Sequence, residues 1–195
     1  MQINDLIKGN KKFREARFSK YETDLKQLSK DGQNPDILFI GCSDSRVTPE
    51  LVLDTKPGDM FTLRNVGNFV PPYNPDNDYH GSSAVIEYAV CVLGVKHIIV
   101  CGHSHCGACK SLYQDLGDSP DLINIKKWLE LGKKAKEYTL LATIDKENKE
   151  QLYRTTEKVS IVYQMENLLT FPYIVKKIKD GELQIHGWYY RIENG

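Results

Sequence analysis

The sequence lacks several features that would place the chain in a specialised class. No apolar run reaches the length of about 18 residues that a membrane-spanning helix needs. Net charge is also absent, because 26 Lys and Arg residues balance 26 Asp and Glu residues, whereas nucleic-acid-binding proteins usually carry a basic excess. Residues 1–18 mix charged and apolar side chains and lack the apolar core of a secretory signal. We therefore expect a cytoplasmic protein that binds neither membranes nor nucleic acids.

Cysteines are few, and their number is odd. The five are Cys42, Cys91, Cys101, Cys106 and Cys109. An odd count in a chain of 195 residues argues against a disulfide framework, which is typical of small secreted domains. In a reducing compartment such thiols serve as metal ligands, as nucleophiles or as small buried side chains. We interpret Cys91, inside an apolar helical segment, and Cys101, at the end of an apolar strand, as packing residues.

The chain is long enough for one domain with a single core, and its hydrophobic fraction of 41% is ordinary for a globular protein. Apolar runs at 36–42, 59–63 and 97–101 have the length of buried strands, and the segments around them follow helical patterns. Residues 183–192 alternate apolar and polar side chains, which favours an antiparallel strand. The prediction is an α/β fold, with a mainly parallel β-sheet flanked by helices and an antiparallel C-terminal edge strand.

The N-terminal segment differs from the rest of the chain. Residues 1–30 have a helical and charged pattern, in which apolar side chains are spread thinly among Lys, Arg, Glu and Asp. Such a segment buries little by itself, so it either packs on its own domain or reaches across to a partner subunit. We predict a single domain over residues 1–195 that begins with an N-terminal helical arm over residues 1–30.

Two loops at the ends of predicted strands carry reactive side chains. Residues 42–46 are Cys-Ser-Asp-Ser-Arg, and residues 102–107 are Gly-His-Ser-His-Cys-Gly. Ligands of parallel sheets bind beyond the carboxyl ends of the strands, and zinc prefers Cys sulfur and His nitrogen. Cys42, His103 and Cys106 would supply three ligands and leave a fourth tetrahedral position open, as in catalytic zinc sites.

The spacing alone leaves alternatives open. Cys106 and Cys109 form a Cys-x-x-Cys pair, so Cys109 could complete a closed structural zinc site, or the pair could be redox-active. Asp44 and Arg46 favour the open site, because an Arg can pair with a carboxylate in a bidentate way and hold it off the metal. The same two residues could instead form a structural ion pair that caps the turn. We interpret His105 as a surface or loop histidine that points away from the metal.

These motifs, together with segments across nearly the whole chain, resemble the β-class carbonic anhydrases, and in particular their plant-like branch. Besides the two loops, the matching segments are 64–72, 86–90, 166–172 and 186–190. The resemblance implies one Zn²⁺ per chain, held by Cys42, His103 and Cys106. It also implies a catalytic dyad of Asp44 and Arg46, and a substrate pocket lined by Gln33, Phe61, Val66, Tyr88 and Gly107.

The activity that the resemblance implies is the reversible hydration of CO₂ to bicarbonate and a proton, by attack of a zinc-bound hydroxide that the dyad orients. The unit of the family is a dimer. The resemblance therefore implies a homodimer or a higher oligomer, in which the N-terminal helices cross to the partner and Gln33 serves the partner's site. Two other functions stay open at this point: a hydrolase of CS₂ on the same scaffold, and a non-catalytic structural zinc protein.

Overall fold

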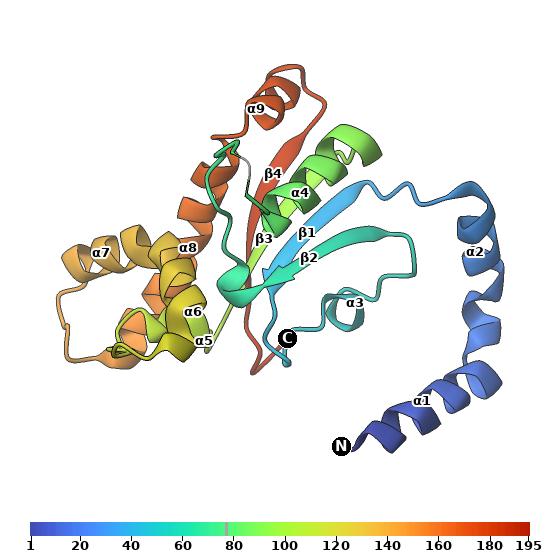
Figure 1. Cartoon of the computed structure of the whole chain (residues 1–195), viewed down its shortest axis with the longest axis horizontal. Helices are drawn as coiled ribbons and strands as arrows, with labels where there is room; N and C mark the ends of the chain where they lie inside the picture. The colour runs from blue at the N-terminus through green and yellow to red at the C-terminus, as the bar shows by residue number, and fades with distance from the viewer. Residues whose placement is uncertain (77) are drawn as a thin grey trace.

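The structure, a computed structural model that describes residues 1–76 and 78–195, has at its centre a sheet of four strands in the order β2-β1-β3-β4 (Figure 1). The strands are β1 (Ile37–Cys42), β2 (Met60–Asn65), β3 (His97–His103) and β4 (Gln184–Tyr190). Each begins within one residue of the range that the sequence predicted. The prediction of an α/β fold with a parallel sheet and flanking helices is confirmed.

The prediction of an antiparallel C-terminal edge strand was wrong. β4 pairs in parallel with β3, from His97 opposite Gln184 to His103 opposite Tyr190. Between the two strands the chain passes through helices that end with α8 (Lys149–Leu168) and α9 (Pro172–Lys179). A helical crossover of this kind is the connection that parallel strands require. The alternation of apolar and polar side chains in β4 therefore indicates that β4 is a partly exposed edge strand, and it does not indicate whether the strand is parallel or antiparallel.

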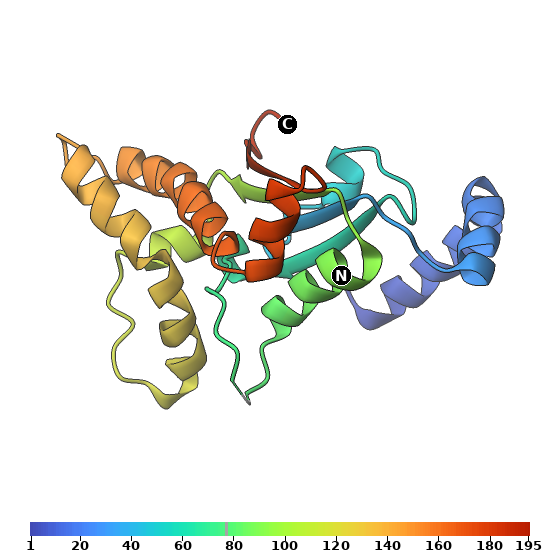
Figure 2. The same ribbon diagram turned by 90° about the horizontal axis from the view of Figure 1, so that it is seen from above.

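The remaining helices lie between the strands in sequence. α3 (Pro49–Val52) follows β1, and β2 is followed by the short helix η1 (Val66–Asn68), α4 (Gly81–Glu87) and the π-helix η2 (Tyr88–Leu93). After β3 come α5 (Gly107–Ser111), η3 (Pro120–Leu122), α6 (Ile123–Leu129), η4 (Glu130–Gly132) and α7 (Lys133–Ala142). Figure 2 shows α4 and α9 on one side of the sheet and α3 on the other.

The main core lies between the sheet and the helices α4, α8 and α9. Alternate strand residues such as Leu38, Ile40, Ile98 and Val100 point into it and are fully buried. The opposite face of the sheet carries a smaller cluster of Phe39, Ile99 and Cys101, so the packing role predicted for Cys101 is confirmed. The same prediction for Cys91 was wrong, since it is exposed: the buried residues of η2 are Ala89 and Val90.

The N-terminal arm is helical, as predicted, and consists of α1 (Ile3–Ala16) and α2 (Phe18–Asp31). It projects away from the sheet (Figures 1 and 2). In the described chain neither helix has a buried residue, and Ile3, Leu6 and Ile7 are all more than half exposed. The arm thus leaves its apolar side chains available to another surface. Every helix within residues 1–76 and 78–195 is too short or too polar to cross a lipid bilayer.

Candidate metal centre

The three predicted metal ligands meet at the carboxyl end of the sheet. Cys42 ends β1 and His103 ends the adjacent strand β3, so parallel pairing places the two strand ends side by side. Cys106 follows as the N-cap residue of α5. The two Sγ atoms and a ring nitrogen of His103 lie within 4.8 Å of one another, and the structured residues contain no other group of three or more potential ligands this close. The fold therefore assembles the set that the sequence predicted.

His103 is oriented to offer one particular nitrogen. The side chain is buried, and its Nδ1 lies 2.8 Å from the carbonyl oxygen of Ser104. Since a carbonyl can only accept, Nδ1 carries the hydrogen and Nε2 keeps its lone pair. That Nε2 is buried and finds no hydrogen-bond partner in the part of the chain that the structure describes. A buried polar atom without a partner is costly, and coordination to a metal ion would satisfy it.

Cys42 lies in a backbone cradle that suits a thiolate. The amide N–H groups of Asp44 and Gly67 each point at its Sγ from 3.4 Å. Gly67 has a φ of 81°, and a Cβ on it would lie 2.8 Å from the Cβ of Ala108. Glycine is the residue that allows this close approach of the backbone to the sulfur.

The two thiols also influence each other. A hydrogen bond with Cys106 and burial raise the pKa of Cys42 to about 12. A hydrogen bond with Cys109 raises the pKa of Cys106 to about 12, with burial adding to the effect. A divalent cation reverses such shifts, because it binds the thiolate form. Two thiolates and one neutral imidazole are a donor set that fits zinc and leaves a fourth tetrahedral position for water.

Cys109 does not join this set. It is 2% exposed and packs in an apolar cluster with Phe69 and Leu129. The group of potential ligands within 4.8 Å, as found over the described residues, consists of Cys42, His103 and Cys106 alone. The geometry favours the open, three-ligand site over the closed alternative.

Asp44 and Arg46 form the predicted bidentate pair. Nε of Arg46 donates to Oδ1 of Asp44 at 2.9 Å, and Nη2 donates to Oδ2 at 2.7 Å. The backbone N–H of Arg46 adds a third bond to Oδ1, at 3.0 Å. These bonds, with the adjacent positive charge, hold the pKa of Asp44 well below its usual range. Arg46 also reaches the carbonyl oxygen of His105 at 2.9 Å, and His105 itself is exposed, as predicted.

Two residues that the sequence analysis did not single out hold the ligand loops in place. Arg64 donates to the carbonyl oxygens of Cys42 and Asp44, at 2.9 and 2.8 Å. Glu157 accepts a hydrogen bond from the backbone N–H of Cys106 at 2.9 Å. Arg64 begins one of the segments that carry the resemblance, so the sequence held a signal for it. Glu157 lies 51 residues after Cys106, and no local motif points to it.

Two of the predicted pocket residues lie beside the metal ligands of their own chain. Val66 directly precedes Gly67, whose N–H reaches the Cys42 sulfur. Its side chain is 43% exposed. Gly107 directly follows Cys106, and a Cβ placed on it would meet open space. Both positions can therefore border a space next to the metal.

The other three lie away from those ligands. Phe61 and Tyr88 pack together, with ring centres 5.7 Å apart. Phe61 is opposite Leu38, four residues before Cys42, which corresponds to about 13 Å along a strand. Gln33 is exposed ahead of β1, and the strand that separates it from Cys42 spans about 20 Å at the usual rise per residue. A single chain does not bring these three side chains to its own metal ligands.

Comparisons with known proteins identify the family. The family model described as carbonic anhydrase matches residues 37–195. A carbonic anhydrase of Synechocystis sp. is 43% identical over 193 residues, which is 97% of this chain and 68% of that protein. A chloroplastic β-carbonic anhydrase of Arabidopsis thaliana is 42% identical over 162 residues, or 82% of this chain and 52% of that protein. Relatives from plants and from cyanobacteria thus agree with the predicted plant-like branch.

Solved structures lead to the same family. That of the β-carbonic anhydrase CcaA matches with a TM-score of 0.90 at 41% identity, over 98% of this chain and 84% of that one. A β-carbonic anhydrase of Sordaria macrospora, described as tetrameric, matches with a TM-score of 0.73 at 33% identity, over 97% and 89%. A carbon disulfide hydrolase, at 19% identity and a TM-score of 0.54, shares the fold alone. The sequence, the fold and a three-ligand metal centre agree: this chain belongs to the carbonic anhydrase family and, within it, to the β class.

Proposed function

We propose that this chain catalyses the reversible hydration of CO₂ to bicarbonate and a proton, with one Zn²⁺ held by Cys42, His103 and Cys106. The observation that carries the proposal is the buried Nε2 of His103, which faces two buried thiols and has no partner within the described residues. When bound, zinc would supply Lewis acidity that lowers the pKa of a coordinated water, so that hydroxide forms near neutral pH.

The dyad would orient the reacting water. Arg46 donates two hydrogen bonds to Oδ1 of Asp44 and one to Oδ2, which keeps the carboxylate ionised and holds it off the metal. Oδ2 keeps one lone pair that can accept a hydrogen bond from the water, so that a lone pair of the water oxygen is directed at the carbon of CO₂. The Arg64 bonds to the carbonyl oxygens of Cys42 and Asp44 would keep this loop in one conformation.

The pocket for CO₂ would be shared between two chains. CO₂ is small and apolar, so side chains such as Val66, Phe61 and Tyr88 suit it, and the Gln33 amide can hydrogen-bond one oxygen. Val66 and Gly107 lie beside their own ligands, whereas Phe61 is about 13 Å away along the strand, Tyr88 packs on Phe61, and Gln33 lies ahead of β1. We therefore assign Val66 and Gly107 to their own site, and Gln33, Phe61 and Tyr88 to the site of the partner.

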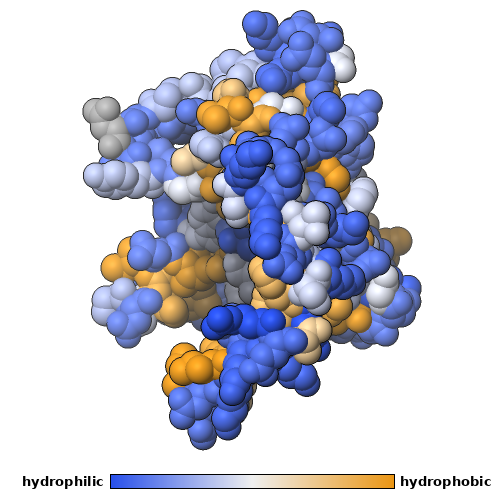
Figure 3. Space-filling view, turned by 90° about the vertical axis from the view of Figure 1, so that its right-hand side faces the viewer, coloured by the Kyte–Doolittle hydropathy of each residue, from blue (hydrophilic) through white to orange (hydrophobic). Residues whose placement is uncertain are grey.

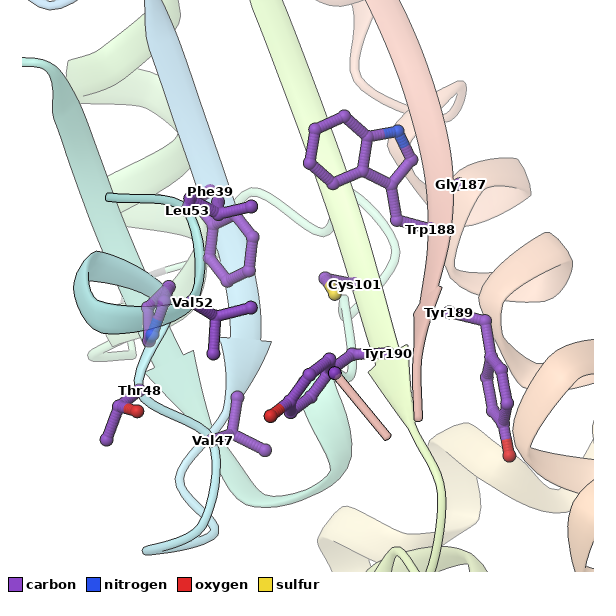
Figure 4. Close-up of a pocket in the computed structure, with 12 residues that line it drawn as sticks. Phe39, Val47, Thr48, Val52, Leu53, Cys101, Gly187, Trp188, Tyr189 and Tyr190 are labelled. Atoms are coloured by element: carbon purple, nitrogen blue, oxygen red, sulfur yellow. The ribbon is translucent and has the colours of Figure 1, made fainter. Parts of the chain in front are cut away.

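A homodimer would be the smallest active unit. Parallel sheets are normally covered on both faces. Here the second face carries a cleft of about 400 Å³ lined by apolar side chains that include Phe39, Val52, Trp188 and Tyr190 (Figure 4). In Figure 3, which views the molecule from the side of the arm, hydrophobic residues are exposed among hydrophilic ones. An arm that crosses to a partner would bury such surfaces, and two dimers could then form the tetramer described for the Sordaria relative.

The compartment follows from the ligand chemistry. Cys42 and Cys106 must stay reduced to bind a metal, so a reducing compartment such as the cytoplasm suits the chain. A CS₂ hydrolase on the same scaffold would need the same ligands, and its support here is likeness of fold alone.

Stopped-flow CO₂ hydration at alkaline pH, on protein of known zinc content, tests the proposal. The rate should scale with zinc. Asp44→Asn should keep the metal and lose about 10²- to 10⁴-fold in rate, the range typical of a positioned proton-transfer group. Cys109→Ser is the matched control and should keep both zinc and activity.

Two results would overturn parts of the proposal. Tightly held zinc with no CO₂ hydration would redirect the function to another substrate, and CS₂ would be tried next. Loss of zinc in Cys109→Ser, with zinc bound but no CO₂ hydration in the wild type, would establish a closed structural site.

A further inference from the structure

Glu157 is a carboxyl group buried beside the metal centre. It lies in α8 and is 2% exposed. A buried carboxylate survives only where hydrogen bonds and a countercharge compensate for its lost hydration. Since the dyad and the three ligands do not include Glu157, its burial needs another explanation.

The polar contacts of Glu157 explain its burial. Oε1 accepts a hydrogen bond from the backbone N–H of Cys106 at 2.9 Å and forms an ion pair with Nη2 of Arg154, also at 2.9 Å. Oε2 accepts from the hydroxyl of Tyr189 at 2.7 Å. The countercharge is thus Arg154, one turn earlier in the same helix, and the third partner belongs to β4. The first partner is the backbone of a metal ligand.

This contact fixes the one ligand that does not lie on a strand. Cys42 and His103 are held by the sheet, whereas Cys106 caps α5, a helix of only five residues. α8 packs tightly on the end of β3, where a Cβ on Gly102 would lie 2.8 Å from Ile161. A bond from α8 to the Cys106 backbone therefore ties this sulfur to the same rigid body that carries His103.

We propose that Glu157 is a positioning residue of the metal centre, which holds Cys106 where its sulfur can share a metal ion with Cys42 and His103. The inference rests on the proposed zinc site and not on the reaction catalysed there. It differs from a purely structural role, in which Glu157 would serve only Arg154 and Tyr189.

Metal affinity separates the two roles. Zinc affinity should be measured by chelator competition on Glu157→Met and Glu157→Gln, together with the sulfur-to-cobalt charge-transfer absorption of the Co²⁺-loaded proteins. Loss of a group that orients a metal ligand typically costs about 10- to 100-fold in affinity, and we expect this for Glu157→Met with a shifted cobalt spectrum. Glu157→Gln should lose less, because its amide oxygen can still accept from Cys106.

Thr156→Val is the matched control. Thr156 is the neighbouring residue of α8 and is also buried, but its hydroxyl bonds Tyr113 and Leu152 instead of the metal loop. The variant should lower the unfolding temperature and leave the zinc affinity and the cobalt spectrum unchanged.

Wild-type affinity and spectrum in Glu157→Met would overturn the proposal, and so would an equal loss of affinity in Thr156→Val. If Glu157→Met fails to fold, Glu157→Gln and Tyr189→Phe decide. Tyr189→Phe removes the bond to Oε2 only and should affect zinc less than Glu157→Gln does, and the reverse order would overturn the proposal. Wild-type protein that binds zinc but does not hydrate CO₂ would refute the function and leave these affinity measurements valid.

Discussion

Zinc binding by this chain should release at least two protons per metal ion. A hydrogen bond with Cys106 and burial raise the pKa of Cys42 to about 12, and a hydrogen bond with Cys109 and burial raise the pKa of Cys106 to about 12. At pH 7.5 to 9 both thiols of the metal-free protein are therefore protonated, and both must ionise to bind zinc.

The number of protons released sets how steeply zinc affinity depends on pH. Two protons released per metal ion make the apparent dissociation constant fall about 100-fold for each unit of pH, or about 2.7 kcal/mol at 1.36 kcal/mol per proton. Binding thus tightens as pH rises, and the dependence continues until the pH approaches the raised pKa values. Cys42→Ser, which has one thiol fewer in the centre, should show about half of this slope.

Chelator competition at several pH values, and calorimetry in buffers of different ionisation enthalpy, would give the count independently. The protein should be handled under a reductant, so that both thiols stay free. A coordinated water that ionises can only add to the protons released. A count clearly below two would therefore refute the reasoning, since it would mean that at least one thiolate is already formed before the metal binds.

Two further predictions concern assembly and stability. Deletion of residues 1–31 should convert a dimer into monomers in sedimentation experiments and abolish CO₂ hydration with them, whereas a truncated protein that stays dimeric and active would exclude an arm that completes the partner's site. Phe171→Ala should lower the free energy of unfolding by about 3–5 kcal/mol and the unfolding temperature by roughly 10 °C, because this ring is 0% exposed and packs against Tyr73 and Tyr173. Ile144→Ala, at a fully exposed side chain, should change neither value measurably in the same calorimetric scan.

The strands could be predicted from the sequence because each apolar run is short and bounded by polar residues. The direction of β4 relative to its neighbour was harder to predict, because the alternation of apolar and polar residues indicates only which face of the strand is buried. Its parallel pairing depends on the crossover through α8 and α9, a tertiary feature that the strand's own residues do not encode. Cys91 shows a similar limit. An apolar helical segment predicts burial on every side, yet η2 buries only part of its surface.

The metal ligands were accessible to sequence reasoning because strand ends and reactive residue types coincide there. Cys42 and His103 each end an apolar strand, and Cys106 follows within the same loop, so their convergence needs only a parallel sheet. The proposed substrate pocket needed the resemblance, and the structure adds only that Phe61, with Tyr88 packed on it, lies opposite Leu38 and not beside Cys42. Spacing within one sequence carries no information about a neighbouring subunit.

Glu157 marks the point where local patterns stop being informative. A glutamate in a long helix is ordinary, and only its burial against the Cys106 backbone distinguishes it. A buried acidic side chain requires a hydrogen-bond partner. That partner is a backbone N–H, which no residue pattern can reveal. A metal centre of this kind is therefore encoded in two parts: ligands that the strand ends make visible, and supporting contacts that appear only when the helices pack on the sheet.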